Sequence, residues 1–111
     1  MKNFLMEGKT LTLTAPYALT SGQGLLVGSI FGVASADAAI STEVEAVTEG
    51  VFTLAKATGA AWTVGALIYW DNTNKNCTTT VGSNKLIGVA ITAAASGDTI
   101  GNVRLNGAFI S

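Results

Sequence analysis

Residues 66–80 read ALIYWDNTNKNCTTT, an apolar run followed by a polar segment and a run rich in threonine. In an extended chain, successive side chains point to opposite faces. The first run therefore carries two apolar pairs on opposite faces, Leu67 with Tyr69 and Ile68 with Trp70. The DNTN segment between the runs consists of residue types that favour turns. The stretch predicts a β-hairpin whose first strand is apolar on both faces.

A strand that is apolar on both faces needs a cover for each of them. In a domain this small, we expect one face to meet the core and the other to meet a neighbouring subunit. We assign Ile68 and Trp70 to the subunit interface. Tyr17 and Trp62 are further candidates for an interface, because aromatic side chains anchor both cores and interfaces.

Strand-like patterning continues through the rest of the chain. Residues 9–14 alternate threonine with leucine, and residues 42–49 alternate glutamate with small apolar residues, as half-buried strands do. Gly50 interrupts the second alternation, which predicts a bulge. The one candidate helix, residues 35–40, is too short to be stable by itself in water. We predict an all-β fold, a single small antiparallel β-barrel or sandwich of about eight short strands.

The composition favours a structural role over an enzymatic one. The 111 residues include no histidine and one cysteine, and 12% of them are charged. Without histidine, the chain lacks the side chain that titrates near neutral pH without perturbation. Cys77 has no partner in the chain, and we interpret it as a small apolar strand residue. The apolar share is 49%, and a chain of this size leaves part of such surface available to a partner.

Charge and hydropathy narrow the range of partners. The formal net charge is −1 and the six basic residues are scattered, so we expect no nucleic acid as a ligand. The longest apolar stretch, residues 25–34, is far shorter than the roughly 20 residues of a membrane-spanning helix, so we expect no membrane. Residues 4–6 are too short an apolar segment for a secretory signal, which predicts synthesis in the cytoplasm.

Three patterns resemble chemical sites and fail on inspection. The GKT of residues 8–10 ends like a phosphate-binding loop, but Asn3 stands where the loop requires its first glycine. Glu43 and Glu45 share one strand face, which is a solvated face more often than a hydrolytic pair. Asp71 begins a turn whose spacing departs from the calcium-loop pattern. We assign no catalytic, cofactor-binding or metal-binding residue, and a hydrolase is the least favoured class.

The chain before the first clear strand has a different character. Residues 1–8 contain the apolar pair Phe4 and Leu5, at a position where chains are often disordered unless they are tied down. We expect residues 1–8 to form an extended N-terminal arm and residues 9–111 to form the barrel or sandwich domain. Phe4 and Leu5 would then make contacts with a partner.

Eight segments along the chain, in this order, carry a family resemblance. They are MKNF (1–4) with EG (7–8), LTLTAP (11–16), SGQG (21–24), FGVA (31–34), TEGVF (48–52), YWD (69–71), IGVA (87–90) and VRLNG (103–107). Together they resemble the DUF2190 family of tailed bacteriophages, over nearly the whole chain.

The resemblance implies a capsid decoration, or cement, protein. Such a protein is a structural virion component that binds the outer surface of the capsid through the major capsid protein, requires no cofactor and is synthesised in the bacterial host cytoplasm. We expect a homo-oligomer, with a trimer favoured and a dimer possible, because both symmetries fit sites on a capsid lattice. The alternative is a carbohydrate-binding β module displayed on a virion for host attachment, with Tyr17, Trp62 and Trp70 as stacking platforms.

Overall fold

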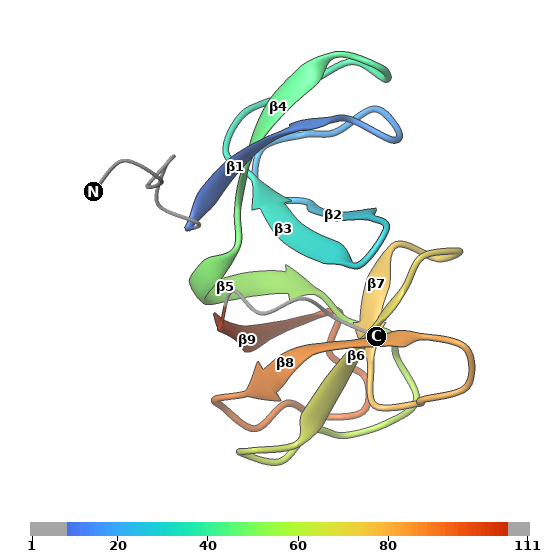
Figure 1. Cartoon of the computed structure of the whole chain (residues 1–111). Helices are drawn as coiled ribbons and strands as arrows, with labels where there is room; N and C mark the ends of the chain where they lie inside the picture. Colours follow the sequence, from blue (N-terminus) through green and yellow to red (C-terminus); the bar gives the residue numbers. More distant parts are fainter. Residues whose placement is uncertain (1–8, 107–111) are drawn as a thin grey trace.

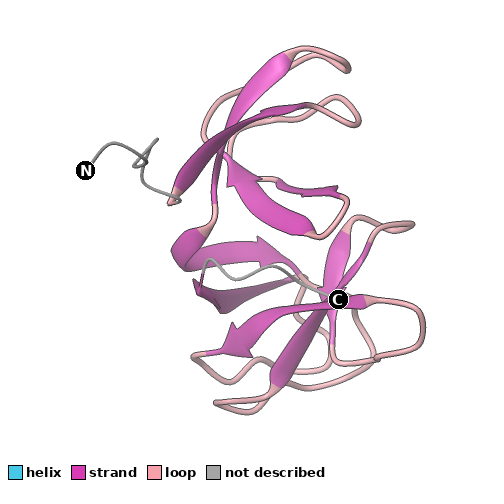
Figure 2. Cartoon of the chain, in the orientation of Figure 1, coloured by secondary structure: helices cyan, strands magenta, loops and turns pink. Residues whose placement is uncertain are grey.

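The structure, a computed structural model, describes residues 9–106 (Figure 1). Within this range the chain forms β-strands joined by turns and loops and contains no helix (Figure 2). The described strands are β1 (Thr10–Thr14), β2 (Gly24–Val27), β3 (Ile30–Ala34), β4 (Glu43–Val47), β5 (Glu49–Ala55), β6 (Leu67–Asp71), β7 (Asn76–Thr78), β8 (Lys85–Ala90) and β9 (Ile100–Asn106). The all-β, antiparallel prediction is confirmed, with nine strands in two sheets.

The first sheet has the strand order β1-β4-β3-β2. Its β1 and β4 show the alternation that the sequence predicts: the leucines of β1 are half-buried and its threonines are exposed. In β4, Val44 and Ala46 are buried while Glu43 and Glu45 are exposed. The periodicity of two is therefore expressed directly as an inner apolar face and an outer polar face.

The second sheet has the order β5-β9-β8-β6-β7 and curls into a half-barrel below the first sheet (Figure 1). The end of β5 meets β7, where Lys56 forms a parallel bridge with Cys77 and the amide of Ala57 donates to the Cys77 carbonyl over 2.8 Å. The predicted hairpin is present here, as β6 paired antiparallel with β7. The register between β6 and β8 shifts at Ile68 and Tyr69, which helps the sheet to bend.

Two local expectations need correction. No bulge forms at Gly50, because β5 pairs with β9 in continuous register from Glu49 to Ala55. What the broken alternation marks is the passage of the chain from one sheet to the other at Thr48, between β4 and β5. Residues 35–40 form no helix; the segment consists of bends and the start of a turn, and Ala38 pairs with Leu19 in an isolated antiparallel bridge.

The core has two parts. One cluster lies within the first sheet and its loops, around Leu25, Val44 and Ala46. The larger cluster fills the half-barrel and includes Phe31 and Val33 of the first sheet. The Phe31 and Trp70 rings lie 4.9 Å apart between centroids and are tilted by 53°, within the range of favourable aromatic pairs. The two sheets are thus joined through the side chains of β3 as well as through the covalent connection.

No helix in the described part of the chain is both long enough and apolar enough to cross a membrane.

Candidate interaction surface

A row of four residues crosses the outside of the half-barrel from β5 to β6. Val51 lies opposite Arg104, Arg104 lies opposite Val89, and Val89 lies opposite Leu67. Residues directly opposite each other in antiparallel strands share one face of the sheet. Val51 and Leu67 are each 52% exposed. We call these four residues the outer row.

The outer row has apolar neighbours on the same face. Tyr69 pairs with Leu86 beside it, and Leu86 is 36% exposed. Ile100 of β9, opposite Ala55, is 59% exposed on the same face, separated from the row by the polar pair Thr53 and Asn102. Arg104 is the one charged residue of the row, and arginine is enriched in interfaces. Exposed apolar residues gathered on one face of a sheet indicate a surface that a partner covers.

Three side chains that the sequence analysis places at an interface are enclosed in the core instead. Ile68 is 0% exposed, and Trp62 and Trp70 are each 2% exposed. For Ile68 and Trp70 the reason is the curl of the second sheet, whose inner face they occupy. The alternation of residues 67–70 is therefore confirmed, but the outward face carries Leu67 and Tyr69. The structure corrects the choice of face.

The same burial removes the stacking platforms of the carbohydrate-binding alternative. A sugar stacks on an exposed aromatic face, and Trp62 and Trp70 offer none. The Trp70 indole N–H is also engaged, since it donates to Oδ1 of Asn72 over 3.0 Å. Tyr17 alone of the three proposed platforms is half-buried rather than fully buried.

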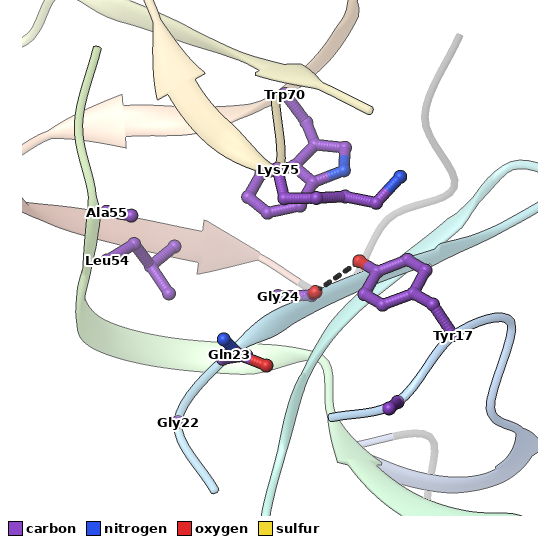
Figure 3. A pocket seen from close by; sticks show the side chains of 9 residues that line it. Tyr17, Gly22, Gln23, Gly24, Leu54, Ala55, Trp70 and Lys75 are labelled. Atoms are coloured by element: carbon purple, nitrogen blue, oxygen red, sulfur yellow. Dashed lines mark hydrogen bonds between the residues drawn. The ribbon is translucent and has the colours of Figure 1, made fainter. Parts of the chain in front are cut away.

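Tyr17 lines a cleft of about 190 Å³ between the two sheets. Its hydroxyl donates to the carbonyl of Gly24 over 2.6 Å, and burial raises the pKa of Tyr17 to about 12. The Lys75 ammonium lies 4.5 Å from the centre of the Tyr17 ring. Figure 3 shows Tyr17 on one side of the cleft and Leu54 and Ala55 on the other, with Lys75 and Trp70 at one end.

Phe4 and Leu5, with the whole proposed arm of residues 1–8, lie outside the described residues. Their assignment to partner contacts stays a prediction.

The acidic residues that resemble chemical sites in the sequence, Glu43, Glu45 and Asp71, have structural roles. Glu43 and Glu45 lie on an exposed face, and Glu45 accepts a hydrogen bond from the Thr12 hydroxyl. Asp71 organises the β6–β7 turn: hydrogen bonds from Asn74 first, and then from Thr73, lower the pKa of its carboxyl group. Among residues 9–106, no three His, Cys, Asp or Glu side chains gather where they could hold a metal ion.

Cys77 is the small core residue that the sequence predicts. Its side chain is 0% exposed, and burial raises the pKa of the thiol to about 12. The thiolate form that reacts with oxidants and electrophiles is therefore suppressed at neutral pH.

Lys56 is the clearest example of a residue whose role the sequence does not reveal. Lys56 is 4% exposed, and its ammonium donates to the carbonyls of Ala57 (3.0 Å), Asp98 (3.4 Å) and Ser96 (3.5 Å). Nothing in the local sequence distinguishes this lysine from a surface lysine. Its carbonyl partners come mainly from the loop before β9, far away in the chain.

The described residues form an all-β scaffold with an exposed apolar row and a small cleft. These features are typical of structural proteins that act by binding partners through their surfaces. The chain matches the family model described as phage cement protein over residues 5–105, and it belongs to that family. It is a structural, non-enzymatic protein of the virion that stabilises the capsid to which it binds. Searches of curated proteins and of solved structures found no match.

Proposed function

We propose that this cement protein acts as a homo-oligomer on the outside of the capsid, with its copies joined through the outer row. The observation that supports this most is the continuous pairing of Val51, Arg104, Val89 and Leu67 across four strands. Apolar surface of this kind loses contact with water when a second copy covers it. Each copy is then held on the capsid by the contacts of its neighbours as well as by its own.

Two properties of the chain favour a second copy as the cover of this surface. The net charge of −1 means that identical copies repel each other little. Three of the four residues of the row are apolar and the fourth is arginine, a residue type enriched in interfaces.

Arg104 favours a trimer over a dimer. In a two-fold dimer joined row to row, the same patch faces itself, which brings two Arg104 side chains toward each other. In a head-to-tail ring, Arg104 meets a different surface of the next copy. The exposed outer face of β4, with Glu43 and Glu45, has the complementary charge. Three is the smallest number of copies that closes such a head-to-tail contact into a ring.

Replacing Leu67 with lysine is expected to break the oligomer while the monomer keeps its fold. Leu67 is 52% exposed, so the change costs little inside one copy, but it puts a charge into the centre of the proposed interface. The mass of each variant, measured by size-exclusion chromatography with light scattering, checks the prediction.

Val64→Lys is the matched control, because Val64 is 70% exposed and lies in the turn before β6 rather than in the outer row. It is expected to leave the mass unchanged. A Leu67→Lys protein of wild-type mass would contradict the proposed interface.

We also propose that residues 1–8 form an arm that binds the major capsid protein, through Phe4 and Leu5, ahead of the domain of residues 9–111. Deleting residues 2–6 is expected to lower the occupancy of capsids to which the protein is added, because apolar contacts with the shell are lost. The oligomer is expected to persist. Quantitative gel analysis of sedimented capsids, with a Phe4→Ala and Leu5→Ala double variant beside the deletion, measures this. Full occupancy by both variants would refute the arm.

A further inference from the structure

The cleft between the sheets lies between one edge of β5 and one edge of β2, and the backbone groups of both edges are partly hydrogen-bonded already. Just after β5, the amide of Lys56 donates to Thr99, so the neighbouring Ala55 directs its N–H and C=O away from β9, toward the side where Lys56 bridges to Cys77 of β7. Just before β2, the Gln23 carbonyl accepts from Ala34 of β3, so Gly24 directs its backbone groups away from β3, and its carbonyl accepts from the Tyr17 hydroxyl. The cleft lies where these two edges approach each other.

The walls of the cleft divide into an apolar part and a cationic part. The half-buried Tyr17 ring and the exposed Ala18 and Ala55 provide the accessible apolar surface, and the buried Leu54 and Trp70 lie behind it. Lys75 is the one charged residue that lines the cleft within the described chain. Contact with the Tyr17 ring and a hydrogen bond to the Asn72 carbonyl hold its ammonium in place.

Gln23 adds a second donor. Its side-chain carbonyl accepts a hydrogen bond from the Thr20 amide over 2.9 Å. That bond occupies the carbonyl end of the side chain, so the NH₂ end is the one that can donate to a ligand. The Tyr17 hydroxyl already donates to Gly24. The side-chain donors that line the cleft therefore suit an acceptor of negative charge.

We propose that this cleft binds a carboxylate on a short aliphatic stem, presented as a glutamate side chain of the capsid protein. The methylene groups pack on Tyr17 and Ala55, and the carboxylate accepts hydrogen bonds from Lys75 and Gln23. Its volume of about 190 Å³ accommodates one such side chain. That the glutamate comes from the capsid protein rests on the proposed function. That the cleft recognises a carboxylate on an aliphatic stem does not.

The nearby Asp71 carboxylate does not take the place of the ligand. It is occupied by the turn, accepting from the amides of Thr73 (2.9 Å) and Asn74 (3.1 Å) and from the Asn74 side chain (2.9 Å). The Lys75 ammonium has three N–H groups, one of which donates to the Asn72 carbonyl. The ammonium thus keeps hydrogen-bonding capacity for an incoming carboxylate.

Butyrate, which has the stem and the carboxylate of a glutamate side chain, tests the recognition chemistry directly. Added to the ¹⁵N-labelled full chain, it is expected to shift the amide signals of Gly22, Gly24 and Ala55 in a saturable way. Butyramide, its neutral analogue, and the Lys75→Asn variant are each expected to weaken binding about tenfold, the effect of losing one charge-assisted hydrogen bond. Equal shifts from butyrate and butyramide, or unchanged butyrate affinity in Lys75→Asn, would overturn the proposal.

Asparagine is the chosen replacement because Lys75 has a φ of +57°, a conformation that asparagine adopts more readily than most residues. The exposed Lys9, outside the cleft, provides the control variant Lys9→Gln. Lys75→Asn is expected to lower capsid occupancy without changing the oligomer mass. Lys9→Gln is expected to change neither the occupancy nor the mass. If Lys75→Asn occupies capsids as the wild type does, the cleft is not a capsid contact, and the outer row is judged separately by the Leu67→Lys result.

Discussion

Replacing Trp62 with alanine is expected to lower the free energy of unfolding by about 3–5 kcal/mol, the cost of deleting a large aromatic side chain from a packed core. Trp62 is 2% exposed, and its backbone exchanges hydrogen bonds of 2.8 and 3.1 Å with Ala94. The Lys56 ammonium lies 5.7 Å from the centre of its ring, so the substitution also removes a cation–π contact from a buried charge. Urea unfolding followed by circular dichroism measures the loss.

The neighbouring Val64→Ala variant is the control, because Val64 is 70% exposed. Exposed substitutions of this kind change the stability by about 0.5 kcal/mol or less. A Trp62→Ala protein as stable as Val64→Ala would contradict the central place of this ring in the core.

The Trp62 ring also explains why residue 101 is glycine. A Cβ at that position would lie 2.3 Å from Cζ3 of Trp62. Gly101→Ala is therefore expected to cost about 1–3 kcal/mol in the wild-type background, as overpacking does. In the Trp62→Ala background the methyl group enters vacated space, and the same change is expected to cost almost nothing. Additive effects of the two substitutions would show that the ring is not the obstacle.

Gly88→Ala is the second substitution with a large expected effect, a loss of about 3 kcal/mol or more, at the upper end of overpacking costs. A Cβ on Gly88 would lie 2.1 Å from the Arg104 carbonyl oxygen and 3.2 Å from a methyl carbon of Val103. The obstacle is the β9 backbone, which cannot change rotamer. To accommodate the methyl group, β8 and β9 would have to separate, and their pairing carries two of the four residues of the outer row.

Gly97→Ala provides the comparison for this prediction. An added Cβ at Gly97 would meet no atom within 4 Å. Its midpoint of urea unfolding is expected to match the wild type, while that of Gly88→Ala falls. Equal midpoints for Gly88→Ala and Gly97→Ala would contradict the close approach of β8 to β9.

Local patterns in the sequence predict the strands well, because a strand's alternation is a property of neighbouring residues. The leucine and glutamate alternations of β1 and β4 have the predicted faces, and the β6–β7 hairpin forms around the turn that Asp71 organises. The broken alternation at Gly50 is also a genuine signal. It marks a change of sheet rather than a bulge, because pairing with the distant β9 keeps β5 in register.

The candidate surfaces could not be predicted in this way. Leu67 joins the outer row through Val89 and Arg104, residues that come more than twenty positions later in the chain. The cleft combines Tyr17, Gly24, Leu54 and Lys75 from four separate segments. No local pattern relates such residues, since the curl of the second sheet and its contact with the first determine their proximity.

The amino-acid sequence by itself determined that this protein is all-β, that residues 67–70 carry two opposed apolar faces, and, through its resemblance to cement proteins, that it belongs on a capsid. The tertiary structure decided which of those faces is inside. Ile68 and Trp70 are buried because the second sheet curls around them, and Leu67 and Tyr69 remain outside. Alternation along one strand separates two faces, but burial depends on which distant strands pack against each of them.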